Sequence, residues 1–117
     1  MERIKSGNLR AVALTSAERS VALPDAPTLA ELGPEYKDFD ITNWFGMLTP
    51  FGVSMTIRTR LYEATAKALR DPAVKDRLLQ QGAQPVGNSP EEFATFIRAE
   101  ITKYARIVEL TGVRLAP

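Results

Sequence analysis

The sequence contains no cysteine and no histidine. Their absence excludes disulfide bonds, thiolate nucleophiles, zinc sites built from these two residue types, and imidazole general bases. The chain also lacks a phosphate-binding glycine loop and a dinucleotide glycine fingerprint. Because these groups are missing, we expect the protein not to be an enzyme and to use no cofactor.

Long apolar runs and blocks of like charge are missing as well. No stretch approaches the length that crosses a bilayer, and Met1–Gly7 lacks the apolar centre of a signal peptide. The 15 basic and 14 acidic residues are interspersed, so no basic block could follow a nucleic-acid backbone. We therefore expect no nucleic-acid partner, and a cytoplasmic location if the chain is expressed as it stands.

A cluster of acidic residues raises the question of a metal site. It consists of Asp25, Glu31, Glu35, Asp38 and Asp40. The spacing matches no calcium loop with alternating aspartates and a final glutamate. It also places no pair of carboxylates about a substrate. Turn formation, helix capping and solvation account for these residues, so we expect no metal.

Three short segments are predicted as strands: Leu9–Thr15, Phe39–Leu48 and Ala83–Val86. The first is mostly apolar and the second begins with alternating apolar residues. The third is the weakest, because Pro85 keeps it from the centre of a sheet. Val113–Leu115 is a further candidate for a last strand or a packed tail.

Capping residues predict where the helices begin. Ser54 precedes a helix to about residue 69, and Asp71, followed by proline, opens a second helix that Gly82 ends. The clearest signal is Ser89-Pro90-Glu91-Glu92, which opens a long helix to about residue 110. Thr28, with a glutamate three residues later, can cap a single turn.

Apolar residues recur at helical spacing in these helices and should face a core. The expected inner residues are Ile57, Leu61, Ala64 and Ala68 in the first helix, Val74, Leu78 and Leu79 in the second, and Phe93, Phe96, Ile97, Ile101, Tyr104, Ile107 and Val108 in the third. Together with the strands, they predict an α/β fold. Its small sheet would be packed by two to three helices, including the long C-terminal one.

Two motifs give the chain a family resemblance. Leu23-Pro24-Asp25-Ala26-Pro27-Thr28 is followed by Asn43-Trp44-Phe45-Gly46, and a strand-like segment from Ile4 precedes both. The sequence resembles the C-terminal region of the tripartite tricarboxylate transporter substrate-binding proteins, the Bug family of TctC-like extracytoplasmic solute receptors. The resemblance runs to about Pro117 but covers only the last third or so of a typical member.

This resemblance implies a C-terminal fragment of a two-lobe receptor with the type II periplasmic-binding fold. We assign residues 1–117 to a single domain, with 1–38 as the end of the second lobe and the crossing segment. Residues 39–117 are then the returning part of the first lobe. The family implies a periplasmic location, small carboxylated solutes and membrane permease subunits as partners. Because solute is trapped by closure of both lobes, we expect weak or no binding without the missing lobe.

Asn43 and Trp44 are the candidate ligand-binding residues, because they lie near the end of a predicted strand. The indole would contact the solute and the amide would bond its carboxylate. In the alternative interpretation, which we favour, Trp44 is a core aromatic that anchors the crossing between lobes, with its ring N–H satisfied locally. The resemblance implies that the main ligand-gripping loops lie upstream.

A self-associating interaction module is the alternative function. A chain without its packing partner exposes sheet edges and the apolar face of its last helix. Self-association, with exchange of that helix between copies, would cover them. The sequence therefore also allows a homo-oligomer without a transport role.

Overall fold

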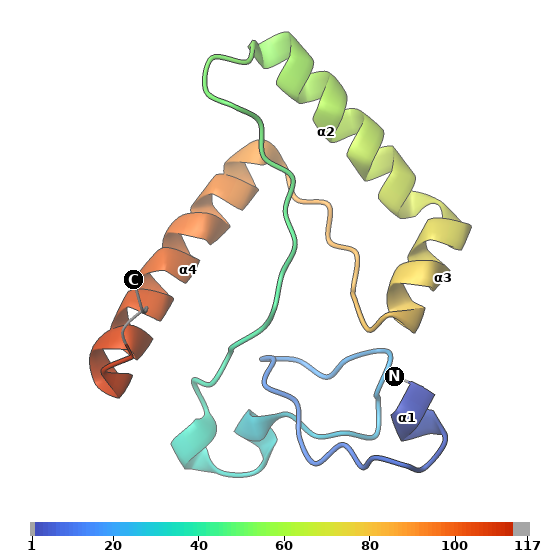
Figure 1. Cartoon of the computed structure of the whole chain (residues 1–117), viewed down its shortest axis with the longest axis vertical. Coiled ribbons are helices and arrows are strands. Elements are labelled where there is room, and N and C mark those ends of the chain that lie inside the picture. The colour runs from blue at the N-terminus through green and yellow to red at the C-terminus, as the bar shows by residue number, and fades with distance from the viewer. Residues whose placement is uncertain (1, 114–117) are drawn as a thin grey trace.

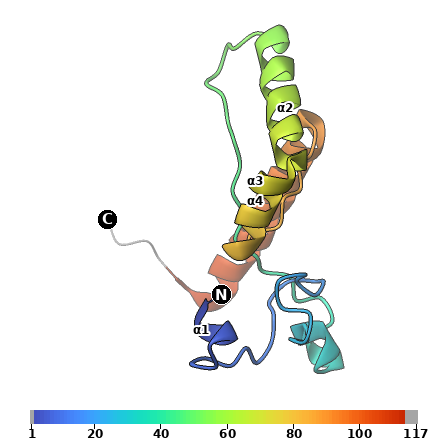
Figure 2. The same cartoon turned by 90° about the vertical axis from the view of Figure 1, so that its right-hand side faces the viewer.

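The computed structural model describes residues 2–113. Within them the elements are α1 (Glu2–Lys5), the short 3-10 helices η1 (Leu29–Glu31) and η2 (Pro34–Tyr36), α2 (Met55–Arg70), α3 (Pro72–Gln80) and α4 (Pro90–Thr111). Figure 1 shows α2 and α4 as the two arms of an arch, with the first part of the chain beneath it. An extended segment rises between the arms to reach α2. Figure 2 shows the same arrangement from the side.

Side-chain caps begin α2 and α3 as the sequence predicts. Ser54 Oγ accepts a hydrogen bond from the backbone N–H of Ile57. The Asp71 carboxylate accepts two bonds from backbone N–H groups in the first turn of α3. These bonds satisfy donors that have no partner inside the helix, so the two starts are encoded locally.

The predicted capping box at the start of α4 is also present. The Glu92 carboxylate accepts a 2.8 Å bond from the Ser89 backbone N–H, and Ser89 Oγ accepts one from the Glu92 N–H. The bond from the Ser89 backbone holds the pKa of Glu92 below its ordinary value. Gly112 ends the helix at φ 65°, a left-handed conformation that glycine adopts without a steric penalty.

The predicted sheet is wrong for the described residues. Leu9–Thr15, Phe39–Leu48 and Ala83–Val86 form no strand in residues 2–113. A strand needs a neighbour that supplies its hydrogen bonds, and these segments have almost none in this part of the chain. Most of the candidate Val113–Leu115 lies outside the described residues.

Among the described residues only fragments of strand pairing occur, and they lie in the first part of the chain. Leu14 and Thr28 form an isolated parallel bridge, and the Ile41 N–H donates to the Thr15 carbonyl at 2.8 Å. Thr28 is 2% exposed and Ala26 is 6% exposed, so this bridge is also the most buried point of the region. It fixes the Leu23–Thr28 motif against the preceding segment.

The core is too small for a chain of this size. Within residues 2–113 its buried residues are Ala26, Thr28, Ala66 and Glu100. The accessible surface is 9932 Å², whereas a compact monomer of this length exposes roughly 6,300 Å². The radius of gyration is 17.3 Å, against about 13.4 Å expected for a compact domain. Much apolar surface is therefore left uncovered.

The predicted inner face of α2 is wrong. Its residues, Ile57, Leu61, Ala64 and Ala68, are all exposed. We call them the exposed stripe of α2. The better-covered residues of the helix are Tyr62, Thr65, Ala66 and Leu69. Periodicity shows that a helix has an apolar side, but it does not show whether a neighbour is there to cover it.

The other two helices follow the prediction in part. In α3, Leu78 and Leu79 are half-buried, whereas Val74 is exposed. In α4 the half-buried residues of the predicted face are Phe93, Phe96, Ile97 and Ile107. Those of the same face that remain exposed are Ile101, Tyr104 and Val108. Coverage of α4 is thus best near its beginning, where the extended segment passes.

Candidate functional site

The extended segment is fixed to α4 by an aromatic cluster. The Trp44 ring meets Phe93 and Phe96 edge-on, with centroids 5.7 and 5.3 Å apart and interplanar angles of 84° and 82°. The two phenylalanines lie one turn apart on α4 and stack at 6.2 Å. Edge-to-face contacts of this kind add about 0.5–1.5 kcal/mol each beyond the area they bury.

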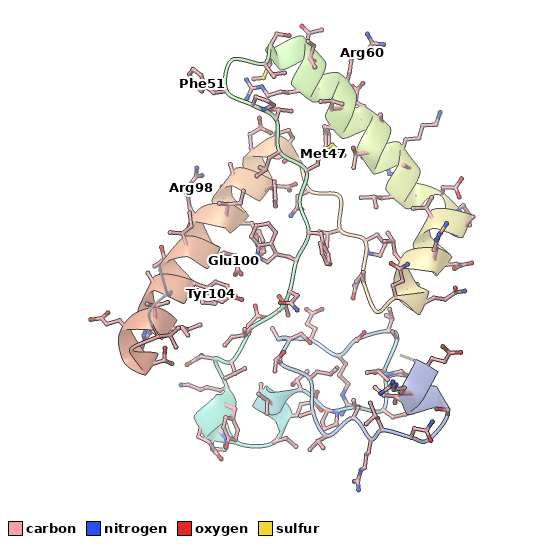
Figure 3. All side chains as sticks on the ribbon, viewed as in Figure 1. Met47, Phe51, Arg60, Arg98, Glu100 and Tyr104 are labelled. Carbon is pink, nitrogen blue, oxygen red and sulfur yellow. The ribbon has the colours of Figure 1, made fainter. Side chains whose placement is uncertain are left out.

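A buried carboxylate completes this contact. Glu100 is 5% exposed, and its Oε2 accepts a 3.2 Å bond from the Trp44 ring N–H. Lys103, one turn later, forms an ion pair with Glu100 and donates a 2.8 Å bond to the Asp40 carbonyl. Figure 3 shows Glu100 on the side of α4 that faces the extended segment. The buried charge is therefore compensated by two donors, as burial of a carboxylate requires.

Gly46 allows the chain to run directly against the Phe93 ring. A Cβ atom at position 46 would lie 2.1 Å from Phe93 Cζ. No side chain fits there unless the ring or the segment moves. We call Trp44, Gly46, Phe93, Glu100 and Lys103 the α4 junction.

The structure brings Trp44 into this junction and leaves Asn43 outside it. The Trp44 ring N–H is satisfied by Glu100, but the residue is 39% exposed and so is not the core aromatic of the anchoring interpretation. Asn43 is exposed, and its side chain makes no hydrogen bond within residues 2–113. Neither residue lies at the end of a strand. Their role as solute contacts stays a prediction.

A hollow that the sequence did not predict lies between the extended segment, α2 and the start of α4. Its volume is about 320 Å³. Its side chains include the apolar Phe45, Met47, Leu48, Leu61 and Ile97 and the polar Arg58, Thr65 and Asn88. Phe45 is 92% exposed, so the hollow is open to solvent. The apolar residues Phe45, Met47 and Leu48 are the available signal in the sequence, but they fall within the predicted strand Phe39–Leu48.

The first part of the chain contains an exposed ion pair. Arg19 forms an ion pair with Glu31 and donates a 2.9 Å bond to the Pro24 carbonyl. Hydrogen bonding from Arg19 lowers the pKa of Glu31 to about 2, and the same contact raises the pKa of Arg19. Asp40 accepts a bond from the Ala17 N–H. Two members of the acidic cluster, Glu31 and Asp40, therefore make structural contacts.

Residues 2–113 contain no group of three or more acidic side chains placed to hold a metal ion. None of the helices described there is both long and apolar enough to cross a membrane.

The arrangement of these elements is that of part of a periplasmic binding protein. The structure is similar to that of the periplasmic binding protein BugD, with a TM-score of 0.79 and 32% sequence identity. The match covers 97% of this chain and 38% of BugD.

The sequence identifies the family. Residues 1–113 match the profile of TctC, the tripartite tricarboxylate transporter family receptor, and the chain belongs to this family. It is 40% identical to protein BugT of Bordetella pertussis over 115 residues, which cover 98% of this chain and 35% of BugT. A protein from the TAR-I ttuE-ttuC′ intergenic region of Agrobacterium vitis is 33% identical over 113 residues, 94% of this chain and 32% of that protein.

The predicted resemblance is therefore confirmed, and the family is one of binding receptors for transport rather than of enzymes. The chain spans about a third of the length of these two relatives.

Proposed function

We propose that this chain is the C-terminal part of a periplasmic solute receptor for small carboxylated solutes. Residues 1–38 would end the second lobe and form the crossing segment, and residues 39–117 would return to the first lobe. Membrane permease subunits would receive the solute from the complete receptor. Family membership supports the receptor role, and the share of BugT that the chain covers supports the partial one.

The observation that carries this proposal is the uncovered surface. The accessible area of 9932 Å² exceeds the value for a compact monomer by roughly 3,600 Å². The hollow beside α2 is open rather than enclosed. A ligand site buries most of a small ligand, which an open hollow cannot do. The chain alone should therefore bind solute weakly or not at all.

Within that receptor we assign different roles to the two candidate residues. The Trp44 ring N–H is bonded to Glu100, so Trp44 would act mainly as an anchor, although the residue is 39% exposed. The exposed amide of Asn43 would donate to a solute carboxylate. A hydrogen bond to a charged group contributes about 1.5–3 kcal/mol, so its loss should be measurable as affinity.

The test is a chimeric receptor in which this chain replaces the matching region of BugT. Calorimetric titration with dicarboxylates, amino acids and nicotinate-like acids should give binding to the chimera and none to the isolated chain. In the chimera, Asn43→Ala should weaken binding by about tenfold or more. Asn8→Ala, which changes an exposed asparagine in the first part of the chain, is the matched control. Micromolar binding to the isolated chain would contradict the proposal.

The exposed stripe of α2 favours one alternative, a self-associating module without a transport role. Pairing of two copies through this stripe, or exchange of α4, would cover apolar surface. Light scattering after size exclusion separates the two functions. A monomer that unfolds cooperatively would count against self-association.

A further inference from the structure

Few polar contacts relate the first part of the chain, residues 2–38, to the helices of the arch (Figure 1). Within residues 2–113 no hydrogen bond runs directly from this part to α2, α3 or α4. Two bonds between residues distant in sequence leave it instead for the extended segment. The Ala17 N–H donates to the Asp40 carboxylate at 3.2 Å, and the Ile41 N–H donates to the Thr15 carbonyl at 2.8 Å. The orientation of this part therefore depends on how Asp40 and Ile41 are held.

Lys103 of α4 holds Asp40 from the opposite side. Its ammonium donates a 2.8 Å bond to the Asp40 carbonyl and forms an ion pair with Glu100. The Lys103 side chain is only 28% exposed, and a hydrogen bond from a charged donor is stronger than one between neutral groups. Asp40 is thus bonded twice, through its carboxylate to the first part of the chain and through its carbonyl to α4.

The lysine is itself held in place. Glu100 lies one turn before it on α4, is 5% exposed and also accepts the bond from the Trp44 ring N–H. A lysine side chain is long and flexible, so pairing with a buried carboxylate on its own helix restricts where the ammonium can lie. Asn43 lies between Asp40 and Trp44, the two residues that bond to this pair. Helix α4 therefore holds the backbone on both sides of Asn43.

We propose that Lys103 is a positioning residue. Through Asp40 it sets the orientation of residues 2–38 relative to α4, and together with Glu100 it fixes the backbone that carries Asn43. This rests on the proposed function, in which residues 2–38 belong to the second lobe and Asn43 contacts the solute. Lys103 does not touch the solute in this proposal. It acts on the affinity through the placement of groups that do.

The orientation is measured on the full 117-residue chain with pairs of spin labels. Because the sequence contains no cysteine, labels attach only where a cysteine is introduced. The reporting pair is Val21→Cys in the first part and Leu110→Cys on α4. The control pair is Ile57→Cys on α2 with Leu110→Cys, and all three positions are exposed. Pulsed electron double resonance should give a narrow distance distribution for both pairs.

Loss of the lysine should affect the reporting pair alone. Lys103→Met should broaden its distance distribution by about twofold or more, because a local tether is removed, and should leave the control pair unchanged. Lys103→Arg, which keeps a charged donor, should restore the narrow distribution. An unchanged reporting pair, equal broadening of both pairs or no rescue by Lys103→Arg would each overturn the proposal.

A second comparison separates the lost bond from the buried charge. Lys103→Met leaves the Glu100 carboxylate with the Trp44 donor alone in the described residues, and an uncompensated buried charge is destabilising in itself. Glu100→Gln removes that charge, keeps an acceptor for the Trp44 ring and leaves Lys103 free to bond to Asp40. Glu100→Gln alone should keep the narrow distribution, whereas Glu100→Gln with Lys103→Met should broaden it. Equal distributions in these two proteins would overturn the proposal.

Asp40→Ala tests the other end of the connection. It removes the carboxylate that accepts the Ala17 N–H bond but keeps the carbonyl that Lys103 binds. The reporting pair should broaden, and adding Lys103→Met should broaden it little further, because the two bonds act in series. Asp38→Ala, at an exposed neighbouring acid, is the control and should have no effect. Fully additive broadening would show that the two bonds act independently, and the connection through Asp40 would be wrong.

The BugT chimera tests the effect on solute. Lys103→Met should weaken binding of the carboxylated solute by about fivefold or more, and Lys103→Arg should restore it. If the label distances change as expected but no chimera binds solute, the positioning role stands and the receptor role is wrong. If the chimera binds solute and Lys103→Met changes neither distances nor affinity, the receptor role stands and the positioning role is wrong. Changed distances with unchanged affinity would overturn the effect on the solute.

Discussion

The beginning of α4 and the exposed stripe of α2 are apolar surfaces on two long helices, and the described residues cover only the first. Phe93 and Phe96 of α4 lie against Trp44 of the extended segment. Ile57 and Leu61 of α2 are 53% and 40% exposed. Similar sequence patterns thus lead to different burial. An apolar stripe indicates that a helix packs against something, but it does not indicate which segment or chain covers it.

The covered surface of α4 differs from the exposed stripe of α2 because it makes a specific hydrogen bond and a close steric contact. The Trp44 ring N–H meets a buried carboxylate, and the absence of a side chain at Gly46 allows close approach. The exposed stripe of α2 has apolar area alone. Of these two surfaces, only the one at the α4 junction therefore has specific contacts within residues 2–113. Three substitutions on the two surfaces, and one outside both as a reference, measure how far that contrast holds.

The largest loss of stability is expected from a substitution in the covered surface of α4. In Gly46→Ala, the added Cβ would lie 2.1 Å from Phe93 Cζ, so the ring or the segment must move. Overpacking of this kind should lower the free energy of unfolding by about 2–3 kcal/mol, measured by urea unfolding. Gly33→Ala is the control, because its Cβ would meet the movable Glu35 carboxylate. Equal effects of the two changes would contradict the close fit.

Trp44→Phe tests the polar part of the same surface. It keeps an aromatic ring but removes the donor to Glu100, which is 5% exposed. The buried carboxylate then depends on Lys103 alone, and the expected loss is about 1–2 kcal/mol in the free energy of unfolding. Phe45→Leu, at the exposed neighbouring position, should change it by less than about 0.5 kcal/mol. A smaller loss for Trp44→Phe than for the control would disprove the role of this bond.

The Arg19–Glu31 pair offers a reference outside both surfaces. The pKa of Glu31 is about 2, below its ordinary value of 4.5. The pair's contribution to the free energy of unfolding is therefore present above pH 4.5 and is lost as the pH falls toward 2. Arg19→Gln should return the pKa of Glu31 toward 4.5 and flatten this dependence, as seen by NMR titration of the carboxyl group. The effect on stability should be small, because the pair is exposed and screened. Arg10→Gln should leave the titration unchanged.

The smallest effect is expected on the uncovered surface. Leu61→Ser should change the unfolding free energy of the isolated chain by less than about 0.5 kcal/mol, because the side chain is already exposed. In the BugT chimera the same change should cost about 2 kcal/mol or more, since a partner then buries the position. An equal, large loss of unfolding free energy in both proteins would show that the exposed stripe is covered within this chain. The contrast between the surfaces of α2 and α4 would then be wrong.

Helix starts could be predicted from the sequence because their bonds are local. Ser54, Asp71 and Ser89 bond to backbone groups two or three residues away, so a short stretch of sequence contains both partners of each bond. The end of α4 at Gly112 is equally local. The strands could not be predicted in the same way, because strand pairing depends on segments distant in the sequence or outside it.

The candidate site was predictable only in part. The sequence singled out Trp44 and favoured a core aromatic as its role. The structure places the ring against α4 with its N–H bonded to Glu100, but 39% exposed, and its role stays a prediction. Glu100 itself carried no signal, because a glutamate on an amphipathic helix is ordinarily solvated. The close approach of Gly46 to Phe93 joins residues far apart in the chain and becomes visible only when both are placed.

Trp44 is the only tryptophan in the sequence, and it lies at the contact that holds the extended segment on α4. Its fluorescence therefore reports on one place in the molecule, without a label. While the indole packs against Phe93 and Phe96, it should emit at shorter wavelength than a fully exposed tryptophan and be quenched less by acrylamide. A red shift would signal that the segment has lifted from the helix, whatever caused the movement.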